Sequence, residues 1–242
     1  MPVEGIPALL WLPGLALAGP EFALDGDDAH YVARVCRAQV GDILHATDGA
    51  GTRASLSVAA VRGEVRVRLG ETRRESQPPR AIVASGAPEK DRADWLVEKI
   101  AELGVTEFQP LECERAGWER FAARRERLGR LAVAALRQSR RAWLLRIREP
   151  LDPAGWTDSL AGAGRRWLAD PAGHSADWSA GSELEVVAIG PSAGFSPGER
   201  DLLATAEFQP VRLSSGRLRT ETAAVAWASG WSAASSATDR TR

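Results

Sequence analysis

The chain of 242 residues has little cysteine, histidine or lysine and no long apolar run. Its two cysteines, Cys36 and Cys113, are far apart and lack the spacing of a disulfide framework or a structural zinc site. The three histidines also lack metal-ligand spacing. No stretch reaches the ~20 consecutive apolar residues of a membrane span. We therefore expect a cytoplasmic protein that holds no metal and does not enter a membrane.

Residues 6–18 are mostly apolar and end in Ala16-Leu17-Ala18-Gly19, which resembles a signal-peptide cleavage site. A signal peptide needs a positively charged segment first, but no lysine or arginine precedes this stretch. Glu4 precedes it instead, and prolines interrupt it. The prediction is a folded N-terminal strand.

Net charge is −1, which argues against a generally basic nucleic-acid binder. The distribution is uneven, however. Only Lys90 and Lys99 are lysines, and the span from Arg115 to Arg148 holds eleven arginines against two glutamates. Such asymmetry is typical of a polyanion site, and the alternative is a solvated helix face. Charge alone leaves both open.

Residues 1–74 read as β structure, with short alternating runs separated by Gly/Asp turn signals. A single helix is expected over 27–37, where the spacing puts His30, Arg34 and Arg37 on one face. Many short strands at close spacing predict a small barrel. The predicted strands are 22–24, 43–46, 54–61 and 64–69.

Residues 75–80, which contain Pro78-Pro79, are predicted to link this barrel to a second domain over 81–231, with a frayed tail over 232–242. In the second domain strands alternate with helices, which predicts an α/β fold with a mostly parallel sheet covered on both faces. A helix should begin at Ser196-Pro197-Gly198-Glu199, because this is a capping box with proline at the first helical position. The expected strands are 81–85, 105–111, 166–169, 184–189 and 211–213, and the helices 91–103, 118–139, 196–206 and 221–230.

Three loops of the second domain follow predicted strands, where open α/β sheets bind ligands. They span 168–171, 189–196 and 213–223. None has the glycine spacing of a dinucleotide or P-loop motif. Gly190 and Gly194 either let the backbone approach a ligand closely or only serve a turn.

Several short motifs occur along the chain in the order, and at approximately the spacing, that they have in one known protein family. They are Glu102-Leu103-Gly104-Val105, Pro110-Leu111 with Glu114-Arg115, Gln138-Ser139, Ile189-Gly190-Pro191 with Gly194-Phe195-Ser196, and Leu218-Arg219-Thr220-Glu221-Thr222-Ala223. His30, Arg34-Val35, Arg37, Gly41-Asp42 and Asp48-Gly49 complete the set. The chain resembles the ribosomal RNA small subunit methyltransferase E family, which methylates N3 of a uridine in 16S rRNA.

The resemblance implies a PUA-like barrel followed by a SPOUT domain with a deep trefoil knot, a homodimer, and S-adenosylmethionine (SAM) as cofactor. The implied substrate is 16S rRNA or the small-subunit particle. Arg219 is expected to stabilise the developing uridinate. Glu221 is expected either to orient Arg219 or to accept the proton, and the alternative is that it only favours a helix N-terminus. The implied cofactor-binding residues are Leu168, Ala169, Asp170, Ile189, Gly190, Pro191, Gly194, Leu213, Ser214, Leu218, Thr220, Thr222 and Ala223.

Arginines and one histidine are the candidate phosphate contacts, with ordinary surface charge as the alternative reading. Those of the first domain are His30, Arg34 and Arg37, and those of the second are Arg92, Arg115, Arg140 and Arg141. The nine tryptophans are expected mainly in the core or a dimer interface.

The chain departs from the family pattern at Ser192, Ala193, Ser214 and Gly216. Two other functions therefore stay open beside the uridine-N3 methyltransferase. One is an RNA-binding or ribosome-assembly protein of the same fold that has lost the cofactor. The other is a methyltransferase of this fold with another RNA target.

Overall fold

The computed structural model describes residues 9–89, 92–160, 164–178 and 184–239. The chain forms two compact units. The first comprises residues up to Gln77 together with Leu136–Leu144, and the second comprises Pro78–Ala135 and Leu145 onward. The sequence had assigned 136–144 to the second domain. In the structure this segment is tied to residues 48–51 of the first unit, since Gly51 N donates to Ala142 O over 3.0 Å and Leu144 N to Gly49 O over 2.9 Å.

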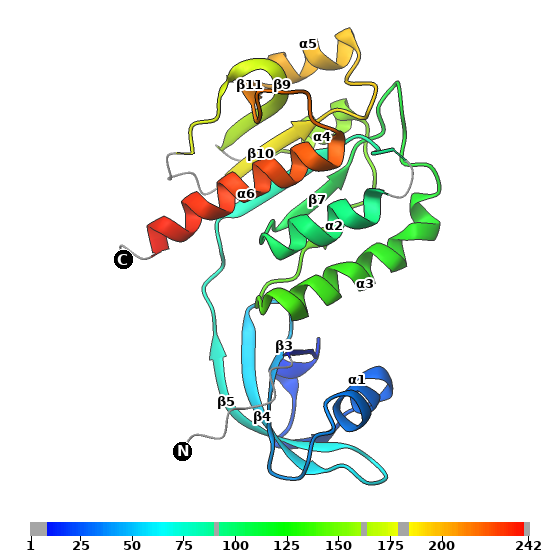
Figure 1. Ribbon diagram of the computed structural model, residues 1–242, viewed down its shortest axis with the longest axis vertical. Helices are drawn as coiled ribbons and strands as arrows, with labels where there is room; N and C mark the ends of the chain where they lie inside the picture. The colour runs from blue at the N-terminus through cyan, green and yellow to red at the C-terminus, as the bar shows by residue number, and fades with distance from the viewer. Residues whose placement is uncertain (1–8, 90–91, 161–163, 179–183, 240–242) are drawn as a thin grey trace. The chain divides into compact units, whose positions relative to one another are not determined.

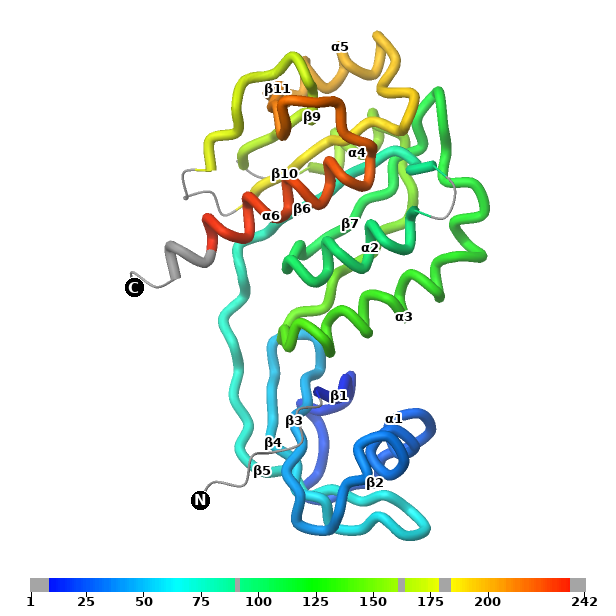
Figure 2. The backbone as a smooth tube through the Cα atoms, viewed as in Figure 1, coloured from blue at the N-terminus to red at the C-terminus, as the bar shows by residue number. Residues whose placement is uncertain are grey.

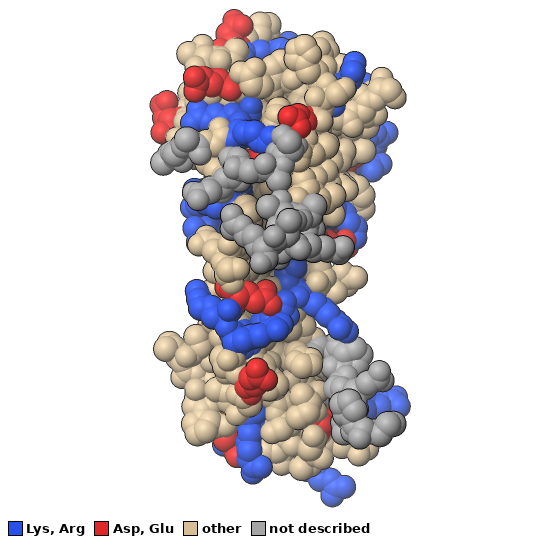
Figure 3. All heavy atoms as spheres, turned by 90° about the vertical axis from the view of Figure 1, so that its left-hand side faces the viewer, with Lys and Arg blue, Asp and Glu red and all other residues tan. Residues whose placement is uncertain are grey.

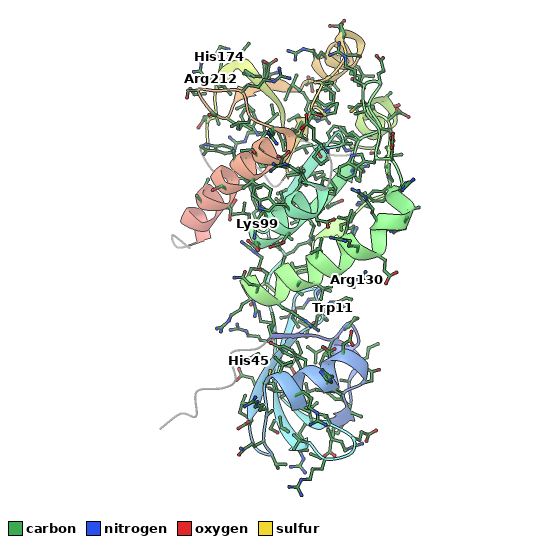
Figure 4. The ribbon with its side chains drawn as sticks, turned by 45° about the vertical axis from the view of Figure 1, so that its right-hand side comes forward. Trp11, His45, Lys99, Arg130, His174 and Arg212 are labelled. Atoms are coloured by element: carbon green, nitrogen blue, oxygen red, sulfur yellow. The ribbon has the colours of Figure 1, made fainter. Side chains whose placement is uncertain are left out.

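The first unit is a five-stranded sheet in the order β1-β3-β4-β5-β2. β1 pairs parallel with β3, and Figure 4 labels Trp11 and His45 on these two strands. The other pairings are antiparallel. Leu10, Leu44, Leu56 and Val67 are buried because alternate residues of each strand face the core. The strands are β1 (Leu9–Trp11), β2 (Glu21–Ala23), β3 (Ile43–Thr47), β4 (Thr52–Ala60) and β5 (Arg66–Arg74).

The helix predicted over 27–37 is present, but in two parts. It begins as α1 (Gly26–His30) and continues as the π-helical η2 (Tyr31–Val35). Val32 anchors it in the core, and Arg37 ends it with a φ of 51°. A short 3-10 turn, η1 (Leu15–Leu17), was not predicted.

The second unit contains a six-stranded sheet in the order β11-β9-β10-β6-β7-β8, with every pairing parallel. This confirms the α/β class. β10 is buried along its whole length, as expected for a parallel strand covered on both faces. The strands are β6 (Arg80–Ser85), β7 (Glu107–Pro110), β8 (Arg146–Ile147), β9 (Arg165–Ser175), β10 (Leu184–Ile189) and β11 (Gln209–Arg212).

Helices cover both faces of this sheet (Figure 1). Trp156 of α4 (Pro153–Ser159) and Leu203 of α5 (Pro197–Thr205) pack with Val186 on one face. On the other face α6 (Thr220–Asp239) packs against β6, β10 and α2 (Arg92–Glu102). α3 (Phe121–Ser139) follows β7 along the chain, and Figure 2 traces the path between these elements.

The local signals for α5 are confirmed. Ser196 Oγ accepts from Glu199 N over 3.2 Å, and Glu199 Oε2 accepts from Ser196 N over 2.7 Å. The predicted end of α6 at Gly230 is too early, since the helix continues to Asp239. The strand β8 and the helix α4 were not predicted. Over the described residues no helix is long and apolar enough to cross a membrane, and no group of three or more His, Cys, Asp or Glu side chains is placed to hold a metal ion.

Candidate functional site

The carboxyl ends of the central strands lie side by side. Ser85 at the end of β6 is the register partner of Ile189 on β10 and of Pro110 on β7. Gly86 N donates to Ile189 O over 2.9 Å, and Leu111 N donates to Ser85 O over 2.8 Å. The loop after β10 therefore leaves the sheet beside the loop after β6, as the reading of a parallel sheet predicted.

The loop after β10 forms a tight turn. Gly194 has a φ of 76° and donates its N–H to Pro191 O over 2.7 Å. A Cβ on Gly190 would lie 2.9 Å from Phe195 N, and one on Gly86 would lie 2.5 Å from Pro191 Cδ. Loop geometry alone therefore requires these glycines.

The loop after β11 meets the loop after β10. Thr220 Oγ1 donates to Gly190 O over 2.9 Å, and Arg217 Nη2 donates to Ser192 O over 3.2 Å. From the segment after β7, Arg115 Nη1 donates to Ala193 O over 3.1 Å. The two segments that the sequence expected to be neighbours are thus joined directly.

The remaining predicted loop, 168–171, lies in a bulge within β9. Leu168 pairs with Pro210 and His174 with Val211, so residues 169–173 leave the ladder between these two pairs. The bulge is fixed from inside by Asp170, whose Oδ1 accepts from Ala172 N over 2.8 Å and whose Oδ2 pairs with Arg200. Burial opposes ionisation, but these two partners hold the pKa of Asp170 below its usual value. Figure 4 labels His174 and Arg212, which lie on these neighbouring strands.

The two candidate catalytic residues have opposite surroundings. Arg219 is exposed and makes no hydrogen bond or ion pair with any side chain that the structure describes. Glu221 is only 2% exposed, and its Oε1 lies 3.3 Å from Arg92 Nε. The carboxylate is thus paired with Arg92, and the described residues show no pairing with Arg219.

The remaining cofactor candidates differ in exposure. Leu168, Ile189, Pro191 and Ala223 are buried. Thr222 is exposed. Ala169, Leu213, Ser214 and Leu218 are half-buried.

Sequence reasoning missed Ser85. Its Oγ is buried and, among the described residues, has no hydrogen-bond partner, and the same holds for Glu221 Oε1. Buried polar atoms without a partner are costly unless a ligand or water satisfies them. A polar residue ending the apolar run 81–84 was the available signal.

In the first unit His30, Arg34 and Arg37 line one open hollow of about 570 Å³. The spacing of these residues predicted that they would share a helix face, and the hollow itself was not predicted. Arg62, in the turn after β4, lines the same hollow. Sequence reasoning had treated Arg62-Gly63 only as a turn signal. Three guanidinium groups and an imidazole around one hollow make an anion-binding surface.

The second set of candidate RNA contacts divides between the units. Arg140 and Arg141 belong to the first unit, and Arg92 and Arg115 to the second. Arg140 O accepts from Arg53, and burial lowers the pKa of Arg141. On the face drawn in Figure 3, basic side chains lie among acidic ones, in keeping with the many ion pairs.

With the site in place, two family models match the chain. An RNA methyltransferase domain matches residues 75–232, and an RNA methyltransferase PUA domain matches residues 24–69. The Ribosomal RNA small subunit methyltransferase E of Synechocystis sp. is 30% identical over 203 residues, which cover 80% of this chain and 67% of that relative. The chain belongs to the ribosomal RNA small subunit methyltransferase E family.

Solved structures share the fold of this chain. A protein of Legionella pneumophila in complex with SAM has a TM-score of 0.81 and 25% identity, covering 96% of this chain and 98% of the other. The Neisseria gonorrhoeae Ribosomal RNA small subunit methyltransferase E, bound to S-adenosyl methionine, has a TM-score of 0.81 at 22% identity, which shows the shared fold. The predicted family, the α/β fold and the PUA-like N-terminal domain are confirmed.

Proposed function

We propose that this chain transfers a methyl group from SAM to N3 of a uridine in 16S rRNA. The observation that carries the proposal is the hydrogen bond from Thr220 Oγ1 to Gly190 O, 2.9 Å long. It joins the loop after β10 to the segment after β11 at the carboxyl edge of a parallel sheet, where such sheets bind ligands. Membership of the family supplies the reaction class.

The residues at this edge fit the cofactor. SAM supplies a methyl group on a cationic sulfur that leaves readily. Gly190, Gly194 and Leu218 are half-buried at these loops, and their backbone is proposed to contact the adenosine, together with the unpartnered Ser85 Oγ. Side chains proposed to line the adenosine pocket are those of Leu168, Ile189 and Leu213.

The remaining loop residues are assigned to the same site through their backbone or their support of these loops. Asp170 shapes the bulge, and Thr220 fixes Gly190. The others in this group are Ala169, Pro191, Ser214, Thr222 and Ala223.

Arg219 is the proposed catalytic residue. Uridine N3 must lose its proton before or during attack, and the negative charge then spreads onto O2 and O4. A guanidinium held beside one of these oxygens stabilises that charge in the same way as an oxyanion-hole donor. Arg219 suits this role because it is exposed at the joined loops and has no partner among the described side chains. The proposed role of Glu221 is to hold the start of α6 through its ion pair with Arg92, without contact with the base.

RNA is proposed to bind at the hollow of the first unit through His30, Arg34, Arg37 and Arg62. These groups contact phosphates and therefore position the RNA without reading its sequence. Binding should weaken steeply with salt, because each neutralised phosphate releases counterions. Removing Arg34 and Arg37 together should lower the salt slope, whereas a flat salt dependence would contradict this footprint.

The trefoil knot, the homodimer and a cytoplasmic location remain part of the proposal. They rest on the resemblance to the family. Arg115, Arg140 and Arg141 remain candidate RNA contacts because of the arginine-rich charge of residues 115–148.

A protein that keeps the fold without the cofactor is the alternative, based on Ser192, Ala193, Ser214 and Gly216. The contacts of the loop after β10 speak against it. Ser192 and Ala193 expose their side chains, while their carbonyl oxygens accept from Arg217 and Arg115. Only the backbone of Ser192 and Ala193 takes part in these contacts, so the replacement of their side chains leaves the contacts intact.

The test is methyl transfer with purified protein, SAM and either 16S rRNA or small subunits, followed by mass spectrometry of the nucleosides. We expect N3-methyluridine at one position, formed about 10²- to 10³-fold more slowly with Arg219→Ala. A different methylated nucleoside would favour another RNA target. RNA binding without SAM binding or methylation would favour the assembly protein.

A further inference from the structure

The N-terminal ends of α2 and α6 are joined by an ion pair. Arg92 Nε, on the first residue of α2, lies 3.3 Å from Glu221 Oε1, on the second residue of α6. The two side chains differ in exposure: that of Arg92 is 51% exposed and that of Glu221 is 2% exposed. The carboxylate is thus enclosed by protein, while its cationic partner reaches it from the surface.

A buried carboxylate near a helix N-terminus gains from the helix dipole, but it still needs a cation or hydrogen bonds to offset the loss of water. Among the described residues, Arg92 is the cation that Glu221 has. The preceding residue, Thr220, donates its hydroxyl to Gly190 O over 2.9 Å. The contacts therefore form a continuous series from Arg92 through Glu221 and Thr220 to the loop after β10.

We propose that Arg92 is a positioning residue for the methyl donor: through Glu221 it fixes the start of α6, and so holds Thr220 against Gly190. Sequence reasoning had made Arg92 a phosphate contact. In the structure its guanidinium instead lies against the buried carboxylate of Glu221. This inference rests on the proposed function, because it concerns the loop assigned to SAM.

The chain offers a matched control in a second ion pair of α2, whose arginine comes from α3. Arg127 pairs with Asp94 of α2, and its side chain is 66% exposed. Replacing Arg127 by glutamine therefore removes one arginine and one ion pair of α2 without touching α6. Arg92→Lys keeps the charge and loses the planar fork of the guanidinium.

The experiment measures the dissociation constants of SAM and of 16S rRNA separately, with thermal unfolding recorded for every variant. We expect Arg92→Gln to weaken SAM binding about tenfold or more and to leave rRNA binding within twofold. Thr220→Val should act in the same direction, and the double variant should lose less than the product of the two single losses. Arg92→Lys should recover part of the loss, and Arg127→Gln should match the wild type.

Several outcomes would overturn the proposal. Weaker rRNA binding with unchanged SAM binding would make Arg92 a phosphate contact. A lowered unfolding temperature with unchanged SAM binding by the folded protein would make the pair purely structural, and Arg92→Lys tests this if Arg92→Gln fails to fold. If the wild type binds no SAM, the proposed function fails and this inference fails with it. If the wild type binds SAM and Arg92→Gln binds it equally well, only this inference fails.

Discussion

The two edges of the parallel sheet contain similar residue types in different states of pairing. At the amino edge, Glu185 accepts from Arg165 Nε over 2.6 Å and from Trp167 Nε1 over 2.8 Å. Glu107 lies between Arg80, whose Nη2 donates over 2.7 Å, and Arg148, whose Nε donates over 2.8 Å. Each buried carboxylate of this edge is held by two donor side chains.

At the carboxyl edge, Ser85 Oγ makes no hydrogen bond within the described residues, and Glu221 has one partner there, the Arg92 guanidinium in its ion pair. Arg219 is exposed, and its side chain has no partner there. Pairing at the amino edge stabilises the fold, whereas a buried polar group without a partner, such as Ser85 Oγ, costs stability unless a ligand or water satisfies it. The difference agrees with the proposal that the carboxyl edge binds the cofactor while the amino edge stabilises the fold.

The largest effect is expected from Arg219→Ala. Loss of one donor aimed at developing charge typically lowers kcat by about 10²- to 10³-fold. The unfolding temperature should stay unchanged, because the side chain has no partner among the described residues to lose. Single-turnover methylation at saturating SAM and RNA measures the change, and a loss of less than threefold would remove Arg219 from the chemistry.

Gly190→Ala should act next. The new Cβ would lie 2.9 Å from Phe195 N and 3.2 Å from Gly194 Cα, so the loop after β10 must shift. SAM binding should weaken about tenfold or more, which corresponds to about 1.4 kcal/mol. Gly198→Ala, whose Cβ would have its nearest neighbour at 4.0 Å, is the control and should bind SAM normally.

At the amino edge, Glu107→Gln should lower stability and leave SAM binding unchanged. Burial opposes ionisation of Glu107, but Arg80 and Arg148 outweigh it and hold its pKa below the usual value. Because the pKa of Glu107 is lower in the folded than in the unfolded chain, its ionised form stabilises the fold above the ordinary glutamate range, and this contribution is lost as the pH falls through the folded pKa.

The cost of Glu107→Gln at pH 7 should therefore be about 1–3 kcal/mol in the free energy of unfolding. The difference between variant and wild type should shrink as the pH falls below about 4.5, the usual value for glutamate. Urea unfolding at several pH values measures both. A difference that does not change with pH would contradict the assigned role of the carboxylate.

The smallest effect concerns Cys113, which follows β7. Burial, with Glu199 and Glu112 nearby, raises the pKa of its thiol to about 12. At pH 8 the folded protein should therefore contain almost no Cys113 thiolate, the form that reacts with iodoacetamide. Peptide mass spectrometry should show Cys113 alkylated only after unfolding in urea. Rapid labelling of the native protein at Cys113 would mean that this part of the carboxyl edge is open.

Local signals predicted local structure well. The capping box at Ser196 depends on four consecutive residues, and the buried strands β6 and β10 are short apolar runs. α4 carried a similar signal, since Asp152 caps it with Pro153 at the first position, and this signal was overlooked. β8 has only two residues and shows no periodicity.

What the sequence could not give is pairing across long separations. Arg92 contacts Glu221 because α2 and α6 pack against each other. Neither segment contains a sequence pattern that predicts this ion pair. Leu136–Leu144 belongs to the first unit because of backbone hydrogen bonds with Gly49 and Gly51, and no sequence pattern predicts these bonds. The joined loops were anticipated, through the resemblance and the rule for parallel sheets.

The most direct test is calorimetric titration of SAM into the wild type, Gly190→Ala and Glu107→Gln. We predict a saturable site on the wild type, at least tenfold weaker binding with Gly190→Ala and unchanged binding with Glu107→Gln. Absence of binding heat and of any thermal shift for the wild type, or an equal loss in both variants, would contradict the assignment of the carboxyl edge as the cofactor site.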